Sequence, residues 1–151
     1  MEQKREYSRD GRAPIPKSEV TSRTMSAIKA KNTKPELLLR KALWQAGIRG
    51  YRLHWKKAPG KPDISFPGKK IAIFVNGCFW HRCPYCQLAI PKSHSEFWKD
   101  KFKKNVDRDK NKISLLEAHG WSTITIWECK LKERTETFVS LIKDIIKKSN
   151  K

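Results

Sequence analysis

Residues 60–75 read GKPDISFPGKKIAIFV, and this stretch decides the fold. Pro67 and Gly68 form a turn signal, which predicts a hairpin with one strand at 63–66 and a second at 71–75. The second strand is apolar throughout, as is typical of a central strand that is covered on both faces. The stretch therefore predicts a sheet with helices packed against it, which is an α/β architecture.

Helices are predicted on both sides of this hairpin along the chain. Thr33 can cap a helix that has Pro35 in its first turn, and Glu36 completes a capping box. Gly47 marks the end of that helix. Further elements are expected as a short helix at 22–29, a short strand at 51–54, a long helix at 95–118, a strand at 121–127 and a last amphipathic helix marked by Phe138, Leu141, Ile142, Ile145 and Ile146. This order predicts a small mixed sheet flanked by helices.

The length of 151 residues is close to that of one ordinary domain. Residues 1–20 are polar and contain two prolines, so we interpret them as a flexible arm and residues 21–151 as a single domain. The longest apolar run is far too short to span a membrane, and no apolar stretch of the secretory type follows the charged N-terminus. We expect a soluble, cytoplasmic and monomeric protein with no membrane partner.

Positive charge is concentrated in one part of the chain. Lys and Arg total 34 against 15 Asp and Glu, which gives a net charge of +19. Residues 25–62 hold ten of the positive residues and one negative residue. Because a merely solubilising surface would spread its charge evenly, this concentration favours nucleic acid as the partner, ahead of an anionic membrane. Lys56, Lys57 and Lys61 are candidate phosphate contacts.

Four cysteines form a tight trio with a distant fourth member, and in an intracellular chain they are not expected to form disulfides. The spacing fits a tetrahedral zinc site. A site of four thiolates has no open coordination position, so the zinc would be structural. The ligands would be Cys78, Cys83, Cys86 and Cys129.

Asp63 stands at the start of the first hairpin strand. A carboxylate there, facing the end of the neighbouring strand, can hold Mg²⁺ beside a scissile phosphate, where the ion neutralises charge and generates hydroxide from water. Asp before a strand is also common for reasons of turn chemistry. Spacing alone leaves both interpretations open.

The stretch FVNGCFWHRCPYC at 74–86 carries the most specific signal. Together with EFW at 96–98, NVDRD at 105–109, GW at 120–121 and WEC at 127–129, it closely resembles the very short patch repair (Vsr) DNA mismatch endonucleases. The resemblance runs from about residue 21 to residue 130. It implies a restriction-endonuclease-like fold of the PD-(D/E)XK type. It also implies an Mg²⁺-dependent enzyme that nicks DNA at T:G mismatches left by deamination of 5-methylcytosine, which initiates very short patch repair.

The resemblance assigns roles to residues around the hairpin. It implies that Asp63 binds Mg²⁺ and that the backbone carbonyl of Val75 is a second ligand. His81 matches a histidine beside the attacked phosphate, as general base or as the partner of a metal-bound water, with an ordinary surface histidine as the alternative. Glu36 would lie near the metal in addition to capping its helix. Asn76 departs from the family pattern, which has histidine there, and an amide cannot take up a proton at neutral pH.

The resemblance also implies zinc ligation by the four cysteines, although the family can use histidine at one or more of these positions. Phe79 and Trp80, and with them Trp98, match aromatics that family members wedge into the DNA stack beside the mismatch. The alternative is a core role, which we expect for Trp44, Trp121 and Trp127. Asn105, Arg108 and Asp109 match a helix motif whose contacts, to phosphate or within the protein, stay open.

The expected partner is double-stranded DNA with a T:G mismatch, in a nucleoid-associated setting. Mismatch-repair proteins or a cognate cytosine methyltransferase are further expected partners. Two alternatives stay open: a restriction-like nuclease with another DNA target, and a zinc-containing DNA-binding module without activity. Retention of Asp63 and His81 argues against the second, whereas Asn76 keeps it open.

Overall fold

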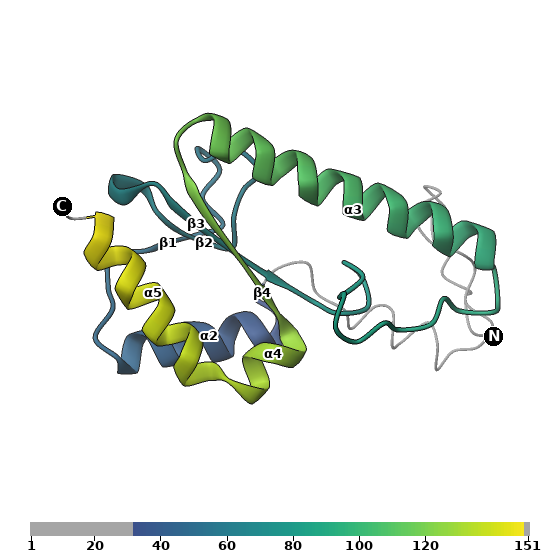
Figure 1. Cartoon of the computed structure of the whole chain (residues 1–151), viewed down its shortest axis with the longest axis horizontal. Helices are drawn as coiled ribbons and strands as arrows, with labels where there is room; N and C mark the ends of the chain where they lie inside the picture. Colours follow the sequence, from purple (N-terminus) through teal and green to yellow (C-terminus); the bar gives the residue numbers. More distant parts are fainter. Residues whose placement is uncertain (1–31, 150–151) are drawn as a thin grey trace, which may run out of the picture.

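The computed structural model describes residues 32–149, which form a four-stranded sheet with helices on both faces (Figure 1). The strands lie in the order β1-β2-β3-β4, with bounds β1 (Arg52–Leu53), β2 (Ile64–Phe66), β3 (Ile71–Asn76) and β4 (Ser122–Trp127). β2 pairs antiparallel with β1 and with β3, whereas β4 is parallel to β3. The predicted hairpin and the small mixed sheet flanked by helices are confirmed.

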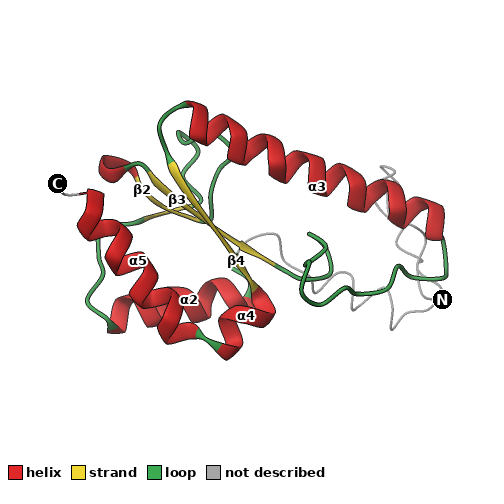
Figure 2. Cartoon of the chain, in the orientation of Figure 1, coloured by secondary structure: helices red, strands yellow, loops and turns green. Residues whose placement is uncertain are grey.

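Two layers of helix enclose the sheet. The long helix α3 (Ser95–Ala118) lies on one face, and the other face carries α2 (Lys34–Gln45), α4 (Glu128–Glu133) and α5 (Thr135–Ser149) (Figure 2). Among residues 32–149, no helix combines the length and the apolar character needed to cross a membrane.

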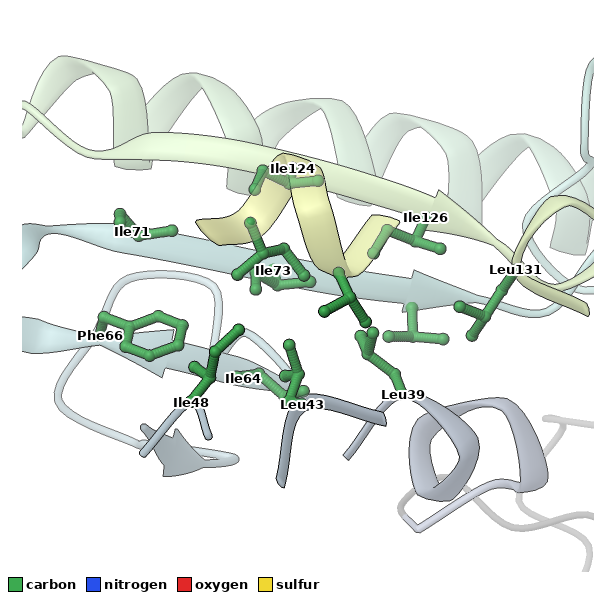
Figure 3. Close-up of a cluster of buried hydrophobic side chains, with 13 residues drawn as sticks. Leu39, Leu43, Ile48, Ile64, Phe66, Ile71, Ile73, Ile124, Ile126 and Leu131 are labelled. Carbon is green, nitrogen blue, oxygen red and sulfur yellow. The ribbon is translucent and has the colours of Figure 1, made fainter. Parts of the chain in front are cut away.

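The central strand β3 is buried at all six of its residues, as its apolar sequence predicts. Because side chains alternate between the faces of a strand, Ile73 packs into the cluster shared with α2 and α5, whereas Phe74 packs with Leu116 of α3. Figure 3 shows the first cluster, in which Leu39 and Leu43 of α2 meet the strands. Burial on both faces fixes the position of β3, and so of the loop that follows it.

Capping defines the ends of α2 as the sequence predicts. The Thr33 hydroxyl accepts the backbone N–H of Glu36 at 3.5 Å, and the Glu36 carboxylate accepts the backbone N–H of Asn32 at 3.0 Å. The back-bond of Glu36 thus falls one residue earlier than in a standard capping box. At the other end Ala46 is the C-cap and Gly47 adopts φ +80°, the left-handed conformation that favours glycine.

Several segments meet at one edge of the sheet, beyond the carboxyl ends of β3 and β4. Because β2 runs antiparallel to β3, Asp63 lies at this edge just before β2 begins. The loop at 77–94 leaves the same edge toward α3, and Cys129 follows the end of β4. The topology therefore brings the predicted magnesium and zinc ligands to one side of the molecule.

The structure differs from two predictions. Residues 128–133, for which no element was predicted, form the short helix α4, because a helix of so few turns produces no recognisable apolar period; Cys129 lies on this helix. Trp44 was expected in the core but is 58% exposed, because the inward stripe of α2 is made by Leu39 and Leu43. The guanidinium of Arg49 covers the Trp44 ring at 3.4 Å from its centre.

Two expectations lie outside the described residues. These are the arm at 1–20 and the short helix at 22–29.

Candidate active site and metal centre

Asp63 reaches from the start of β2 to the neighbouring strand. Its Oδ2 accepts the backbone N–H of Val75 at 2.8 Å. Within a strand the N–H and C=O of one residue point to the same side, so the Val75 carbonyl is directed toward Asp63 as well. Burial raises the pKa of Asp63 to about 6; the Val75 N–H opposes this shift and the charge of Glu36 adds to it. A carboxylate that is costly to ionise is well placed to bind a cation.

Glu36 and His54 converge on Asp63. The three residues offer one ligand atom each, all within 4.8 Å of one another. His54 Nε2 lies 3.3 Å from Glu36 Oε2, and His54 Nδ1 lies 3.9 Å from Asp63 Oδ1. Glu36 was expected near this site, whereas His54 was missed. The predicted strands at 51–54 and 63–66 contained the signal, because antiparallel pairing of Leu53 with Ile64 sets residue 54 opposite residue 63.

Glu36 lies beside Asp63 and also accepts hydrogen bonds near the start of its own helix. Besides accepting the Asn32 N–H, its Oε2 accepts a hydrogen bond from Arg40 Nη2 at 3.2 Å. The same Nη2 lies 3.1 Å from His54 Nε2 and 2.8 Å from the Asn32 side-chain oxygen. Arg40 thus compensates the charge of a carboxylate that is only 2% exposed.

His81 is held by a carboxylate of α3. Its Nδ1 lies 2.6 Å from Asp109 Oδ2. An ionised carboxylate only accepts hydrogen bonds, so Nδ1 donates and the Nε2 atom is left for another partner. Asn105 Nδ2 donates to the carbonyl of Trp80 at 3.1 Å. The contacts of Asp109 and Asn105, left open by the sequence, are internal in this structure and brace the loop against α3.

Asn76 is the last residue of β3 and lies on the face of the sheet that α3 covers. It is 7% exposed and lines a small pocket between β3 and α3 together with Asp109 and Lys112. Residues that follow one another in a strand point to opposite faces, so the side chain of Val75 packs on the α2 side and that of Asn76 on the α3 side. Asn76 is therefore buried near the carboxylate that holds His81.

The four cysteines come together as their spacing predicts. All four Sγ atoms lie within 4.8 Å of one another, and those of Cys83 and Cys129 are 3.7 Å apart. Tetrahedral Zn–S bonds of about 2.3 Å place sulfur atoms about 3.8 Å apart, so the donor set fits zinc.

The electrostatics of this cluster suit a cation. Burial raises the pKa of Cys78 to about 12, and the contact with Cys129 raises that of Cys86. Burial also acts to raise the pKa of Cys83, but backbone N–H groups of Cys86 and Tyr85 outweigh it and lower that pKa. Neighbouring thiolates repel one another, so full ionisation of the four requires a bound metal.

The loop aromatics form a cluster with the start of α3. Phe79 lies edge-on to Trp80, Trp98 and Phe102, with ring centres 5.2–5.6 Å apart. Phe79 and Trp80 are half-buried, whereas Trp98 is only 5% exposed. The burial of Trp98 favours a supporting role beneath the other two rather than a wedge of its own.

Lys56, Lys57 and Lys61 are exposed on the segment between β1 and β2, which leads directly into Asp63. This segment packs tightly against α3. At Gly60 the approach is so close that an added Cβ would lie only 2.8 Å from Lys112 Cβ. The packing holds the three lysines at the same edge of the sheet as the candidate metal ligands.

Comparisons with known proteins identify the family. The family model described as DNA mismatch endonuclease Vsr matches residues 15–87. The DNA mismatch endonuclease Vsr of Escherichia coli (strain K12) is 36% identical over 113 residues, which cover 75% of this chain and 72% of the relative. The chain belongs to the Vsr family. Two further relatives are type II nicking enzymes: V.XorIIP of Xanthomonas oryzae pv. oryzae is 42% identical over 110 residues (72% of this chain, 79% of the relative), and V.NmeAIP of Neisseria meningitidis is 41% identical over 128 residues (81% and 91%).

Membership of the Vsr family confirms the resemblance seen in the sequence and places the chain among the DNA endonucleases. The part matched by the Vsr family model includes Asp63, Glu36, His54 and His81. Asp109 and Cys129 lie beyond it, and their contacts link α3 and α4 to that part.

The raised pKa of Asp63 predicts that this residue destabilises the fold when it is ionised without a metal. From the ordinary value of 3.8 to about 6, the shift corresponds to about 3 kcal/mol at neutral pH. Because the folded pKa exceeds the unfolded one, the contribution of Asp63 to stability is most favourable below about pH 4 and is lost as the pH rises through about 6. In Mg²⁺-free, zinc-loaded protein, Asp63→Asn should therefore raise the melting temperature at pH 7.5, with little gain near pH 4.

Asn keeps an oxygen for the Val75 N–H, so the comparison changes only the charge. Added Mg²⁺ should stabilise the parent protein alone, so that its melting temperature becomes higher than that of Asp63→Asn. Equal melting temperatures at pH 7.5 without Mg²⁺ would show that ionised Asp63 is not destabilising.

Proposed function

We propose that this protein is an Mg²⁺-dependent endonuclease that nicks one strand of duplex DNA at T:G mismatches, with a structural zinc and a restriction-endonuclease-like core. The observation that carries the proposal is the placement of the Asp63 carboxylate against the end of β3, with Glu36 within ligand distance. Family membership supports an endonuclease.

The residues around Asp63 fit a magnesium ion. Asp63 Oδ2 accepts the Val75 N–H, which leaves Oδ1 for a cation, and the Val75 carbonyl is a second oxygen directed to this edge. When bound, Mg²⁺ would neutralise phosphate charge and lower the pKa of water. Glu36, fixed by Arg40 and by the Asn32 N–H, would orient the groups that surround this position.

His81 is the candidate proton acceptor. The 2.6 Å contact with Asp109 orients the imidazole and stabilises the charge that it gains with a proton. The free Nε2 can take the proton of the attacking water. Asn76 cannot share this work, since its buried amide does not titrate.

Mismatch preference is attributed to Phe79 and Trp80. In Phe79→Ala and Trp80→Ala we expect the ratio of T:G to matched cleavage to fall, because stacking on an opened step is worth about 1–3 kcal/mol per aromatic ring. The residual cleavage should stay Mg²⁺-dependent. Single-turnover rates on duplexes that differ by one base pair measure the ratio.

A core role for the same residues predicts a different result. Truncation of a buried aromatic costs about 3–5 kcal/mol of stability and leaves the ratio unchanged. Trp44→Ala is the matched control, because Trp44 is exposed on α2 and lies outside the aromatic cluster. A large drop in melting temperature with an unchanged ratio of T:G to matched cleavage would show that Phe79 and Trp80 do not insert into the DNA stack.

Phosphate binding is attributed to Lys56, Lys57 and Lys61. Each phosphate contact contributes a slope of about −0.9 to the dependence of log K on log salt. Replacing all three lysines with Ala should flatten this slope by up to about 3, for matched and T:G duplexes alike. Fluorescence anisotropy over a salt series measures it.

A charge-matched control is available on the opposite layer. Alanine at Lys143, Lys147 and Lys148 of α5 removes the same number of charges from exposed positions. The slope should change little there. An equal effect of both triple variants would mean that net charge, and not the segment beside Asp63, governs binding.

Nicking of a panel of duplexes, with and without Mg²⁺, tests the function directly. Strand-specific cleavage of T:G duplexes above matched ones is the expected result. The relatives named type II nicking enzymes favour one second candidate, a nuclease with another DNA target, so the panel includes matched duplexes and several flanking sequences. Equal cleavage of T:G and matched sites would select that candidate. Binding without any cleavage would select an inactive DNA-binding module.

A further inference from the structure

His54 has no role in the function proposed above, yet it lies between the two carboxylates of the site. Its side chain is 16% exposed, with Nε2 at 3.3 Å from Glu36 Oε2 and Nδ1 at 3.9 Å from Asp63 Oδ1. The imidazole thus turns one nitrogen to each carboxylate. This is the arrangement of a metal-bound histidine whose second nitrogen donates to a carboxylate.

The backbone of His54 is held in place for this contact. The residue adopts φ +47°, in the left-handed region that few residues other than glycine, asparagine and histidine enter readily. Its N–H donates to the Asp63 carbonyl at 3.1 Å, which continues the pairing of β1 with β2 by one residue. Main-chain strain of this kind is concentrated at functional sites. His54 and Asp63 are therefore coupled through both backbone and side chain.

We propose that His54 Nδ1 is a nitrogen ligand of the same metal that Asp63 binds, with Glu36 accepting a hydrogen bond from the Nε2–H of His54. The proposal rests on the metal-dependent function given above. Two metal–ligand bonds of about 2.1 Å span at most about 4.2 Å, so one cation fits between atoms 3.9 Å apart. Glu36 then acts as the carboxylate that orients the histidine.

Arg40 contacts the nitrogen of His54 that faces Glu36. Its Nη2 lies 3.1 Å from His54 Nε2, and a guanidinium can only donate, so Nε2 accepts this bond in the neutral tautomer that carries its proton on Nδ1. Ligation through Nδ1 requires the other neutral tautomer, in which Nε2 carries the proton and donates to Glu36. Arg40 keeps its bonds to Glu36 and to the Asn32 side chain in either state.

A nitrogen ligand changes which cation the site prefers. Magnesium favours an all-oxygen environment, whereas imidazole is a better ligand for transition metals. Manganese accepts both oxygen and nitrogen ligands, and its electron spin resonance shows which of them are bound. We therefore expect His54 to increase affinity for Mn²⁺ more than for Mg²⁺.

The variant His54→Asn provides the test. Asparagine tolerates the left-handed backbone and offers an amide oxygen close to the position of Nδ1, so a ligand remains while the imidazole nitrogen is lost. In zinc-loaded protein the Kd for Mn²⁺, measured by calorimetry, should rise on the order of tenfold or more. The Kd for Mg²⁺ should change less. His54→Gln is the second variant, and equal melting temperatures confirm that each variant folds.

Electron spin echo envelope modulation of bound Mn²⁺ detects a directly coordinated imidazole nitrogen. The nitrogen signal should be present in the parent protein and in His81→Asn, and absent in His54→Asn. Mn²⁺ binding without a nitrogen signal in the parent protein would overturn the proposal, as would a signal that disappears only in His81→Asn. These measurements use no cleavage. Failure of the parent protein to nick any duplex would count against the proposed function, while the spectra would still decide the ligand.

Discussion

Asp63→Asn should reduce nicking of a T:G duplex by on the order of 10³-fold or more while leaving its binding within a few-fold of the parent protein. The substitution keeps the shape of the side chain and an oxygen for the Val75 N–H, but removes the charge that would hold Mg²⁺. A bound metal contributes several kcal/mol of transition-state stabilisation, and about 4 kcal/mol corresponds to a 10³-fold rate difference. Single-turnover nicking and anisotropy on the same duplex measure the two quantities separately.

Asp100→Asn is the control for the loss of a carboxylate. Asp100 is exposed on α3, where it pairs with Lys104 at 2.8 Å, so its replacement should change neither rate nor affinity. Nicking by Asp63→Asn at the parent rate would exclude Asp63 as the essential metal ligand. A parallel loss of binding would instead assign Asp63 to DNA recognition.

Loss of the zinc site should have the largest effect on stability. In the proposed site Cys129 of α4 would join Cys78, Cys83 and Cys86 from the loop after β3, so a bound zinc would hold this loop against the segment that follows β4. Structural zinc contributes free energy comparable to the whole stability of a domain. Cys129→Ser should therefore lower the melting temperature by about 10 °C or more and make the loop at 77–94 sensitive to proteolysis.

Cys129→His tests whether ligation itself is responsible. Histidine is an ordinary zinc ligand, so this variant should retain more zinc and more stability than Cys129→Ser. Elemental analysis of each purified protein gives the stoichiometry, with one zinc expected per parent chain. Active, soluble parent protein without zinc would contradict the assignment. Because His81 lies in the loop that the cluster holds, zinc removal should also reduce nicking.

Much of this architecture follows from neighbouring residues along the chain. The strand at 71–75 is apolar at every position, so it is stable only when both of its faces are buried. The N-cap at Thr33 and the helix end at Gly47 depend on contacts within one helical turn. The cysteine spacing restricts the ligand chemistry in the same way. Residues that are close in sequence interact in almost any fold, which is why the buried strand, the helix ends and the grouping of Cys78, Cys83 and Cys86 were confirmed.

The sequence by itself determined the four strands, the helices α2, α3 and α5, the family and the cysteine cluster, whereas tertiary structure decided which polar groups pair. His54 meets Asp63 because of a strand register, and His81 meets Asp109 although 28 positions separate them. The exposure of Trp44 likewise depends on which side of α2 faces the sheet. The few polar side chains of the site form no periodic pattern along the sequence. Their partners are set by the strand register and the helix packing, which in turn depend on burial of apolar residues elsewhere in the fold. The contacts of His54 with Asp63 and of His81 with Asp109 were therefore recognised only when the strands and α3 were in place.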